Sequence, residues 1–348
     1  MPLSYKNRFQ RKTMLICCIS LYIIMVNIAK AESLKTITGV GSSFAAPLYQ
    51  AWASEVTKET HIQLNYQALG SSAGQNQVLA KTVHFGASDI PMTEQKRKNS
   101  NLMQFPTAMG GIVIAVHIPG IQSNQLQLTG SVLADIYSGK ITKWNDPAII
   151  ALNKNQNLPD IDIAPIHRAD GSGTTAVFTN YLSEQSADWK TNYGSNTSID
   201  WPTGMGGKGN SSVASIVKNV EGSIGYIEYA YMLQSHLDAV KLKNKIGQFV
   251  AATPITFQNA ANAANWDYDK GFNTNLIDVS GDQVWPIISA TYVLVPIQEE
   301  RTKDVIQFFN WGIQNGDKIT IQLHYVSLPD SVKKKIISLW KDSNLTGQ

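Results

Sequence analysis

Hydrophobic positions after residue 36 alternate between the period of a strand and the period of a helix, and turns rich in glycine and serine separate these segments. Residues 36–39 have the pattern of a short strand. Leu48, Trp52 and Val56 then recur at a spacing of four after Pro47, which predicts a helix with one buried face. The next predicted elements are a strand at 62–66, a helix after the turn at 69–74, and a strand at 84–88 that ends at Asp89. This βαβαβ order predicts a parallel sheet covered by helices.

The same order resumes in the middle of the chain. The predicted elements are a strand at 161–167, a turn at 170–175, a helix to about residue 182, a glycine-rich stretch at 203–210, a helix at 211–219, a strand at 223–227 and a mostly helical tail at 300–340. Two apolar strands, 111–117 and 289–296, interrupt this order. If both cross between lobes, residues 32–110 and 287–348 form a discontinuous lobe I and residues 111–286 form lobe II.

The first 31 residues differ from the rest of the chain. Four basic residues precede an almost wholly apolar run at 14–28, and small residues stand at Ala29 and Ala31. This is the pattern of a secretory signal peptide that is cleaved after Ala31. An apolar run of about 15 residues is short of the ~20 that a spanning helix needs, so we favour cleavage over a membrane anchor.

Composition narrows the function classes. The chain has 348 residues with 43% hydrophobic and 16% charged residues, which is typical of a globular protein. Its cysteines, Cys17 and Cys18, both lie in the apolar run, so the mature chain is expected to have no disulfide, zinc thiolate or cysteine nucleophile. Loss of five basic residues with the signal peptide turns the net charge of +3 into −2. We therefore expect no nucleic-acid partner.

Three serine- and glycine-rich turns each follow a strand and open a helix. Ligands of open parallel sheets bind at this edge, and a helix start offers free N–H groups and a partial positive charge to an anion. Arg168 stands just before the third turn, and its planar guanidinium suits a tetrahedral oxyanion. For Asp170, the alternative to a contact with the ligand is an ion pair with Arg168 that braces the turn.

Several ordered motifs carry a resemblance to a known family. They are the runs at 39–47 (GVGSSFAAP), 70–74 (GSSAG), 85–89 (FGASD), 168–174 (RADGSGT), 201–210 (WPTGMGGKGN), 225–231 (GYIEYAY) and 327–332 (SLPDSV). Together they resemble the periplasmic phosphate-binding proteins of Pst-type ABC transporters over essentially the whole mature chain. The resemblance implies a type II periplasmic binding protein fold: two doubly wound α/β lobes, joined by two hinge strands, with phosphate in the cleft. It also implies a monomer in the periplasm that docks on a membrane permease and needs no cofactor.

The resemblance also implies the ligand contacts. They fall on Ser43, Phe44 (backbone N–H), Ser71, Asp89, Arg168, Ser172, Gly173 (backbone N–H) and Thr174. Ser43 replaces the threonine usual in the family, which keeps the hydroxyl and loses a methyl group. An ionised Asp89 only accepts hydrogen bonds, so it favours phosphate, which carries a proton, over sulfate, which has none. We expect the nearby Arg168 to keep Asp89 ionised.

Two other functions compete with this interpretation. A secreted phosphatase would share a phosphate site, but the segment Gly171–Gly173 lacks the spacing of a nucleophile elbow. The histidines are scattered without metal spacing, so neither a metal site nor catalysis is expected. A binding protein for another oxyanion, such as sulfate or molybdate, is the second alternative, and Asp89 disfavours it.

Overall fold

The computed structural model describes residues 34–345, and the chain from Thr36 onward forms one compact unit. The predicted signal peptide, residues 1–31, lies outside the described residues. The first part of the chain holds β1 (Lys35–Gly41), α2 (Ala46–Thr60), β2 (Ile62–Gln67), α3 (Ser71–Leu79), β3 (Phe85–Ser88), α4 (Glu94–Asn99) and β4 (Leu102–His117). The predicted βαβαβ order is therefore confirmed.

The middle of the chain is longer and more irregular. It contains β5 (Gln127–Leu128), α5 (Gly130–Tyr137), α6 (Pro147–Leu152), β6 (Ala164–Arg168), α7 (Gly173–Gln185), α8 (Ala187–Asn192), β7 (Met205–Gly207), α9 (Gly209–Asn219), β8 (Ser223–Glu228), α10 (Tyr229–Ser235), β9 (Asp238–Ala239), β10 (Lys241–Lys243), β11 (Phe249–Val250) and α11 (Pro254–Asn262). The last part contains β12 (Ile288–Pro296), α12 (Thr302–Asn315), α13 (Asp317–Gln322) and α14 (Asp330–Asp342).

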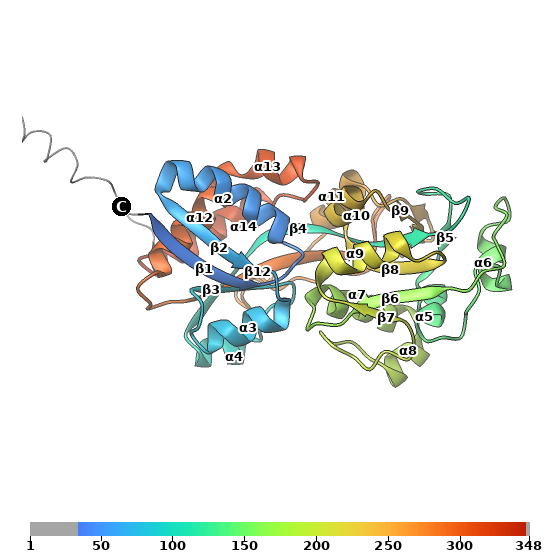
Figure 1. The fold of residues 1–348 in the computed structure, drawn as a ribbon. Coiled ribbons are helices and arrows are strands. Elements are labelled where there is room, and N and C mark those ends of the chain that lie inside the picture. Colours follow the sequence, from blue (N-terminus) through green and yellow to red (C-terminus); the bar gives the residue numbers. More distant parts are fainter. Residues whose placement is uncertain (1–33, 346–348) are drawn as a thin grey trace, which may run out of the picture. The chain divides into compact units, whose positions relative to one another are not determined.

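One sheet runs through the molecule in the order β2-β1-β3-β12-β4-β8-β6-β7, and β9 pairs with the end of β4 along the edge opposite β8. The pairs β1–β3, β6–β8 and β6–β7 are parallel, whereas β12 is antiparallel to both of its neighbours. In the first half of the sheet, α3 and α4 lie on one face and α2, α12 and α14 on the other (Figure 1). Parallel strands covered by helices on both faces are the doubly wound arrangement that the sequence predicted.

The strand β4 belongs to both halves of the sheet. Its beginning, Leu102–Gly111, pairs with β12, and its end, Ile112–His117, pairs with β8. The sequence predicted only residues 111–117 as a strand. The missed part contains Pro106, which pairs with Tyr292 where a β-bulge interrupts the register, and bulges are positions where a sheet tolerates proline. The lobe boundaries proposed from the sequence stay a prediction.

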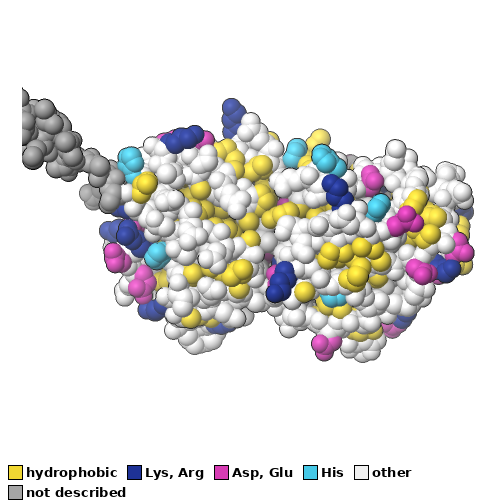
Figure 2. Space-filling view, viewed as in Figure 1, with side chains coloured by type: hydrophobic (Ala, Val, Ile, Leu, Met, Phe, Trp, Pro, Cys, Tyr) yellow, Lys and Arg dark blue, Asp and Glu magenta, His cyan; other side chains and the backbone are white. Residues whose placement is uncertain are grey.

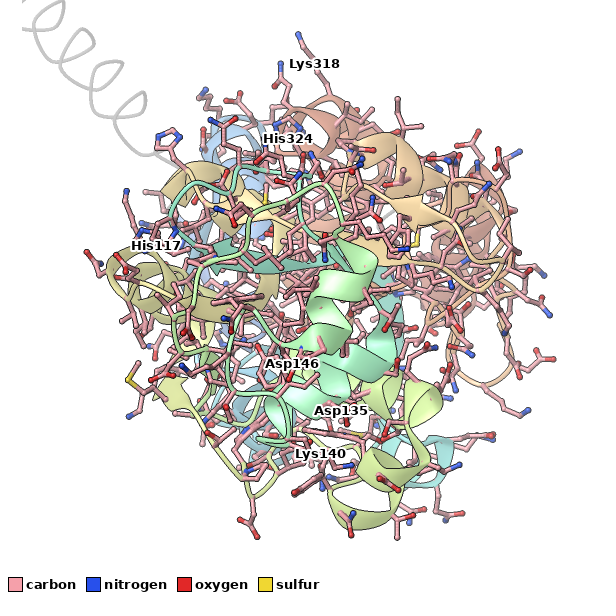
Figure 3. The ribbon with its side chains drawn as sticks, turned by 90° about the vertical axis from the view of Figure 1, so that its right-hand side faces the viewer. His117, Asp135, Lys140, Asp146, Lys318 and His324 are labelled. Carbon is pink, nitrogen blue, oxygen red and sulfur yellow. The ribbon has the colours of Figure 1, made fainter. Side chains whose placement is uncertain are left out.

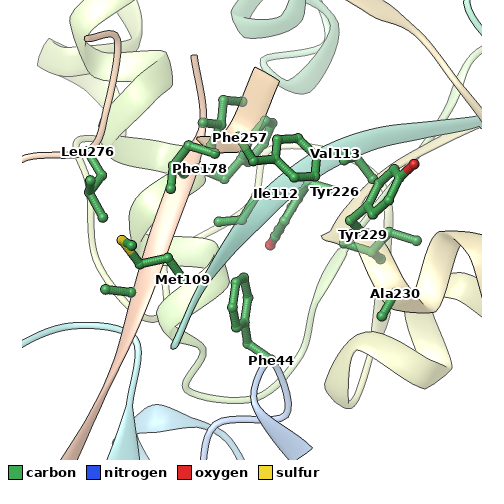
Figure 4. Packing of buried hydrophobic residues seen from close by; sticks show 14 of the residues in the cluster. Phe44, Met109, Ile112, Val113, Phe178, Tyr226, Tyr229, Ala230, Phe257 and Leu276 are labelled. Carbon is green, nitrogen blue, oxygen red and sulfur yellow. The ribbon is translucent and has the colours of Figure 1, made fainter. Parts of the chain in front are cut away.

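Aromatic rings join the aliphatic side chains of the core. The ring of Phe309 on α12 makes edge contacts with Tyr49, Phe85 and Phe105, at centroid distances of 5.1 to 5.8 Å. In the other half, Tyr226 stacks on Phe178 at 4.3 Å. Figure 4 shows buried side chains packed around β4 where it leaves β12, among them Met109, Ile112 and Phe257. This packing fixes the strands whose ends carry the candidate site.

The surface carries mixed charge. Figure 2 shows lysine and arginine side chains scattered among acidic ones on the face in view. Near α5, Lys140 pairs with Asp188 at 2.7 Å and with Asp135 at 3.6 Å (Figure 3). Such exposed pairs contribute little to stability, because water and salt screen them. Within residues 34–345, no helix is both long and apolar enough to cross a membrane.

Candidate functional site

Three strand ends and three helix starts meet in one place, as the sequence predicted for its serine- and glycine-rich turns. β1, β3 and β6 end there, and α2, α3 and α7 begin there. Gly171, before α7, accepts a hydrogen bond at its carbonyl from the backbone N–H of Ser72 on α3, at 3.0 Å. A Cβ atom on Gly173 would lie 2.5 Å from the Oγ of Ser71 and 2.6 Å from the Cβ of Asp89. Only a glycine allows this approach.

All of the sequence-predicted site residues are buried. Apart from Gly173, the largest exposed fraction among them is the 5% of Asp89. The contacts bring Ser71, Asp89 and Gly173 together directly, and Arg168 lies beside Thr174 with 3.5 Å between its Nη1 and the threonine Oγ1. Ser172 is next to Gly173 in the chain. Ser43 and Phe44 form the turn before α2, and their neighbour Ser42 contacts Asp89.

Asp89 accepts hydrogen bonds from three side chains. Its Oδ1 accepts from the hydroxyls of Ser42 at 2.5 Å and Thr291 at 2.7 Å, and its Oδ2 accepts from the Ser71 hydroxyl at 3.4 Å. Burial raises the pKa of Asp89 above its ordinary value, while these hydrogen bonds and the charge of Arg168 oppose that shift. We expected Arg168 to keep this carboxyl ionised, and Arg168 does act in that direction, but burial is the larger effect.

Arg168 ends β6 with its guanidinium held on one edge. Its Nε donates to Oδ1 of Asp170 at 2.8 Å, and its Nη2 donates to Oδ2 at 2.5 Å. Burial raises the pKa of Asp170, but the hydrogen bond and charge of Arg168 outweigh it, so that pKa is lowered. The alternative that we kept for Asp170, a brace for the turn, is therefore confirmed. The brace leaves Nη1 directed toward the start of α7.

The helix α7 begins with a hydroxyl cap. Ser172 Oγ accepts from the backbone N–H of Thr175 at 3.1 Å. The N–H groups of the first helical residues, Gly173 and Thr174, have no acceptor within the helix, and they carry the positive end of its dipole. An acceptor of negative charge is stabilised at such a position.

The turn before α2 is held by side chains from distant segments. Ser43 Oγ accepts from the backbone N–H of Asn210 at 3.2 Å and from its Nδ2 at 3.0 Å. The Tyr231 hydroxyl donates to the Ser43 carbonyl at 2.7 Å, and the Tyr325 hydroxyl donates to the Phe44 carbonyl at 2.6 Å. The Phe44 N–H lies 3.0 Å from Ser42 Oγ.

Sequence reasoning missed four polar residues of this cluster: Ser42, Thr291, Asn210 and Tyr231. Ser42 stands beside the predicted Ser43. The sequence pattern around β1 does not show which of the two serine side chains points toward Asp89. Thr291 is 202 residues from Asp89, so no local pattern connects them. Asn210 and Tyr231 end motifs that we used only for the resemblance.

A cavity of about 660 Å³ lies beside the cluster. Asp89 is the one sequence-predicted site residue that borders it. Its other walls include amide and hydroxyl side chains, such as those of Asn180, Asn196 and Ser289. Among the described residues, no group of three or more histidine, cysteine or acidic side chains is arranged to hold a metal ion.

Comparison with known proteins gives consistent matches. The family described as PBP superfamily domain matches residues 28–311. The phosphate-binding protein PstS of Pasteurella multocida is 46% identical over 324 residues, which cover 92% of this chain and 94% of that protein. The phosphate-binding protein PstS of Haemophilus influenzae is 45% identical, covering 92% of this chain and 97% of that protein. Both relatives are named as binding proteins.

A solved structure of a high-affinity periplasmic phosphate-binding protein, PfluDING bound with phosphate, superposes with a TM-score of 0.71. The match covers 87% of this chain and 93% of that chain at 18% identity, so the likeness concerns the fold. The predicted type II periplasmic binding protein fold is confirmed. By its family match and by the identity to these relatives, the chain belongs to the PBP superfamily and, within it, to the PstS family of phosphate-binding proteins.

Proposed function

We propose that this protein binds inorganic phosphate where α2, α3 and α7 begin, and delivers it to the membrane permease of a phosphate ABC transporter. The observation that carries the proposal is a buried carboxyl, that of Asp89, placed in direct contact with the residues that open α3 and α7. A carboxyl in an anion site is costly unless the anion brings a hydrogen to share with it. Phosphate does so near neutral pH.

The proposed contacts combine charge, hydroxyls and backbone donors. Arg168 offers its Nη1, and the helix starts each contribute up to ~2 kcal/mol toward an anion in a partly buried position. Residues proposed to bind phosphate are Ser43, Phe44, Ser71, Asp89, Arg168, Ser172, Gly173 and Thr174. Phosphate has enough acceptor oxygens to use these donors together, while Asp89 takes its hydrogen.

The same carboxyl accounts for selectivity against sulfate. Sulfate has no proton, so its lone pairs would face those of Asp89, and a buried charged acceptor would stay unpaired. That costs ~1–3 kcal/mol or more, which is about tenfold to a few hundredfold in affinity. A protein that binds another oxyanion without a proton would not benefit from this carboxyl.

The test is calorimetric titration with phosphate, and with phosphate in the presence of excess sulfate. In Asp89→Asn, the new side-chain amide can donate to sulfate, so we expect sulfate to compete at least about tenfold better than in the wild type. Asp188→Asn is the matched control, since this aspartate is exposed and pairs with Lys140 far from the cluster. Equal rejection of sulfate by Asp89→Asn and by the wild type would refute this account of the site.

We propose that the chain is cleaved after Ala31 and acts as a periplasmic monomer without cofactor. Its lobes, 32–110 with 287–348 and 111–286, would close on phosphate by bending of β4 and β12, a common motion of two rigid bodies joined by hinges. We propose that the protein is not an enzyme. His167, the histidine next to Arg168, stacks on Trp201 with 4.8 Å between ring centroids. Hydrolysis of a phosphate ester by the purified protein would instead support a phosphatase.

A further inference from the structure

The hydroxyl of Ser43 contacts a residue from a distant part of the chain. Asn210 lies in the first turn of α9 and is fully buried. Its backbone N–H and its Nδ2 both point to Ser43 Oγ, at 3.2 and 3.0 Å. One oxygen atom of the turn before α2 therefore faces two donors that belong to a single asparagine.

The orientation of the Asn210 amide follows from its other contact. Its Oδ1 lies 3.1 Å from the backbone nitrogen of Glu228, which can only donate a hydrogen bond. The oxygen of the amide must therefore face Glu228, and the NH₂ group must face Ser43. A flipped amide would set two donors against each other at Glu228.

A serine hydroxyl has two lone pairs and one hydrogen. Asn210 occupies both lone pairs of Ser43 Oγ, so the remaining hydrogen bond of this hydroxyl can only be a donated one. No acceptor among residues 34–345 takes that hydrogen. Two accepted hydrogen bonds also polarise the O–H group and strengthen the bond that it donates.

We propose that Asn210 is a positioning residue that makes the Ser43 hydroxyl an obligate donor to phosphate. This inference rests on the proposed function and assigns Asn210 a role in affinity without contact to the ligand. Tyr231, from the same part of the chain as Asn210, also donates to Ser43, at its carbonyl. Separation of Ser43 from Asn210 would free the hydroxyl to rotate, so the donor forms only when the two segments meet.

The isosteric variant Asn210→Asp tests the inference. One carboxylate oxygen still accepts from the Glu228 N–H, while the other accepts the Ser43 hydrogen and withdraws it from the ligand. We expect the affinity for inorganic phosphate, measured by titration calorimetry near neutral pH, to fall at least about 100-fold.

In a Ser43→Ala background the same change adds charge but has no hydroxyl to redirect, and we expect the phosphate affinity to fall by about tenfold or less. Asn219→Asp, at the exposed end of α9, controls for added charge on this helix and should bind like the wild type.

Two further results separate the possible failures. If Asn210→Asp lowers the phosphate affinity by the same factor in both backgrounds, Asn210 does not act through Ser43 and the inference is wrong. If the wild type binds no phosphate, the proposed function fails and takes this inference with it. Circular dichroism checks the fold of each variant. If Asn210→Asp does not fold, Asn210→Ala replaces it. We expect this variant to lose phosphate affinity by about tenfold in the wild-type background and to lose none in the Ser43→Ala background. An equal loss of affinity in both backgrounds would overturn the inference.

Discussion

Replacing Glu228 by glutamine should change how the stability of this protein depends on pH. Glu228 ends β8, is fully buried, and caps α10 by accepting from the backbone N–H of Ala230 at 2.9 Å. Burial raises the pKa of this carboxyl from 4.5 to about 8, although the Ala230 hydrogen bond opposes the shift. The folded protein therefore holds a proton on Glu228 at pH values where the unfolded chain has lost it.

The magnitude follows from the two pKa values. Between them the folded state binds one more proton than the unfolded state, so the free energy of unfolding falls as the pH rises, by up to about 1.4 kcal/mol per pH unit. Over the full window from 4.5 to about 8, this amounts to roughly 5 kcal/mol at most. The contribution is fully present below the lower value and is lost as the pH passes the upper one. Glutamine resembles the protonated acid and does not titrate.

Urea unfolding of the phosphate-free protein, followed by tryptophan fluorescence at about pH 5, 6, 7 and 8, measures the effect. We expect the wild type to lose stability relative to Glu228→Gln across this series, by a total of several kcal/mol. Glu221→Gln, on the exposed turn before β8, is the matched control and should follow the wild type. A difference between wild type and Glu228→Gln that does not vary with pH would refute the reasoning.

Three further predictions concern the approach of α7 to Asp89, the selectivity against sulfate and the core. Gly173→Ala should keep the fold but lower the phosphate affinity by about tenfold to a hundredfold in calorimetric titration, because the alanine Cβ would lie 2.6 Å from the Cβ of Asp89. Unchanged affinity would contradict this contact. Rejection of sulfate should weaken as the pH falls through the raised pKa of Asp89, since the protonated carboxyl can donate to sulfate, and competition titrations at several pH values would measure this; a constant selectivity would contradict it. Phe309→Ala should lower the free energy of unfolding in urea by about 3–5 kcal/mol, because the ring is fully buried among other rings. A loss below about 1 kcal/mol would contradict this, since it would mean that the core around position 309 repacks.

Local patterns predicted those elements whose signals are contained in a few residues. Pro47 and the spacing of Leu48, Trp52 and Val56 indicated α2, and the buried face of that helix contains all three apolar residues. The turn at 69–74 was placed slightly wrong, since α3 begins at Ser71. Gly70 is the residue directly before α3, and its φ of 95° favours glycine, which has no side chain.

Contacts between distant segments were beyond the reach of such patterns. Thr291 reaches Asp89 from the strand β12, and Asn210 reaches Ser43 from α9. The strand β7 lies in the segment that we described only as a glycine-rich stretch, because Met205–Gly207 has two glycines and offers no hydrophobic period to recognise. The first half of β4 was not predicted, and it contains Pro106, a residue that is rare inside strands.

The position of β12 in the sheet has a consequence for how the chain acquires its fold. This strand lies between β3 and β4, yet it comes some 170 residues after β4 along the chain. A nascent chain that stops before residue 288 has the outer strands of the first half but lacks the strand that joins them. Pairing over such separations is slow because a long loop must close first. Ribosome-stalled chains that end before β12 should therefore stay sensitive to protease in their N-terminal part, and protection should appear only after nearly the entire polypeptide has been synthesised.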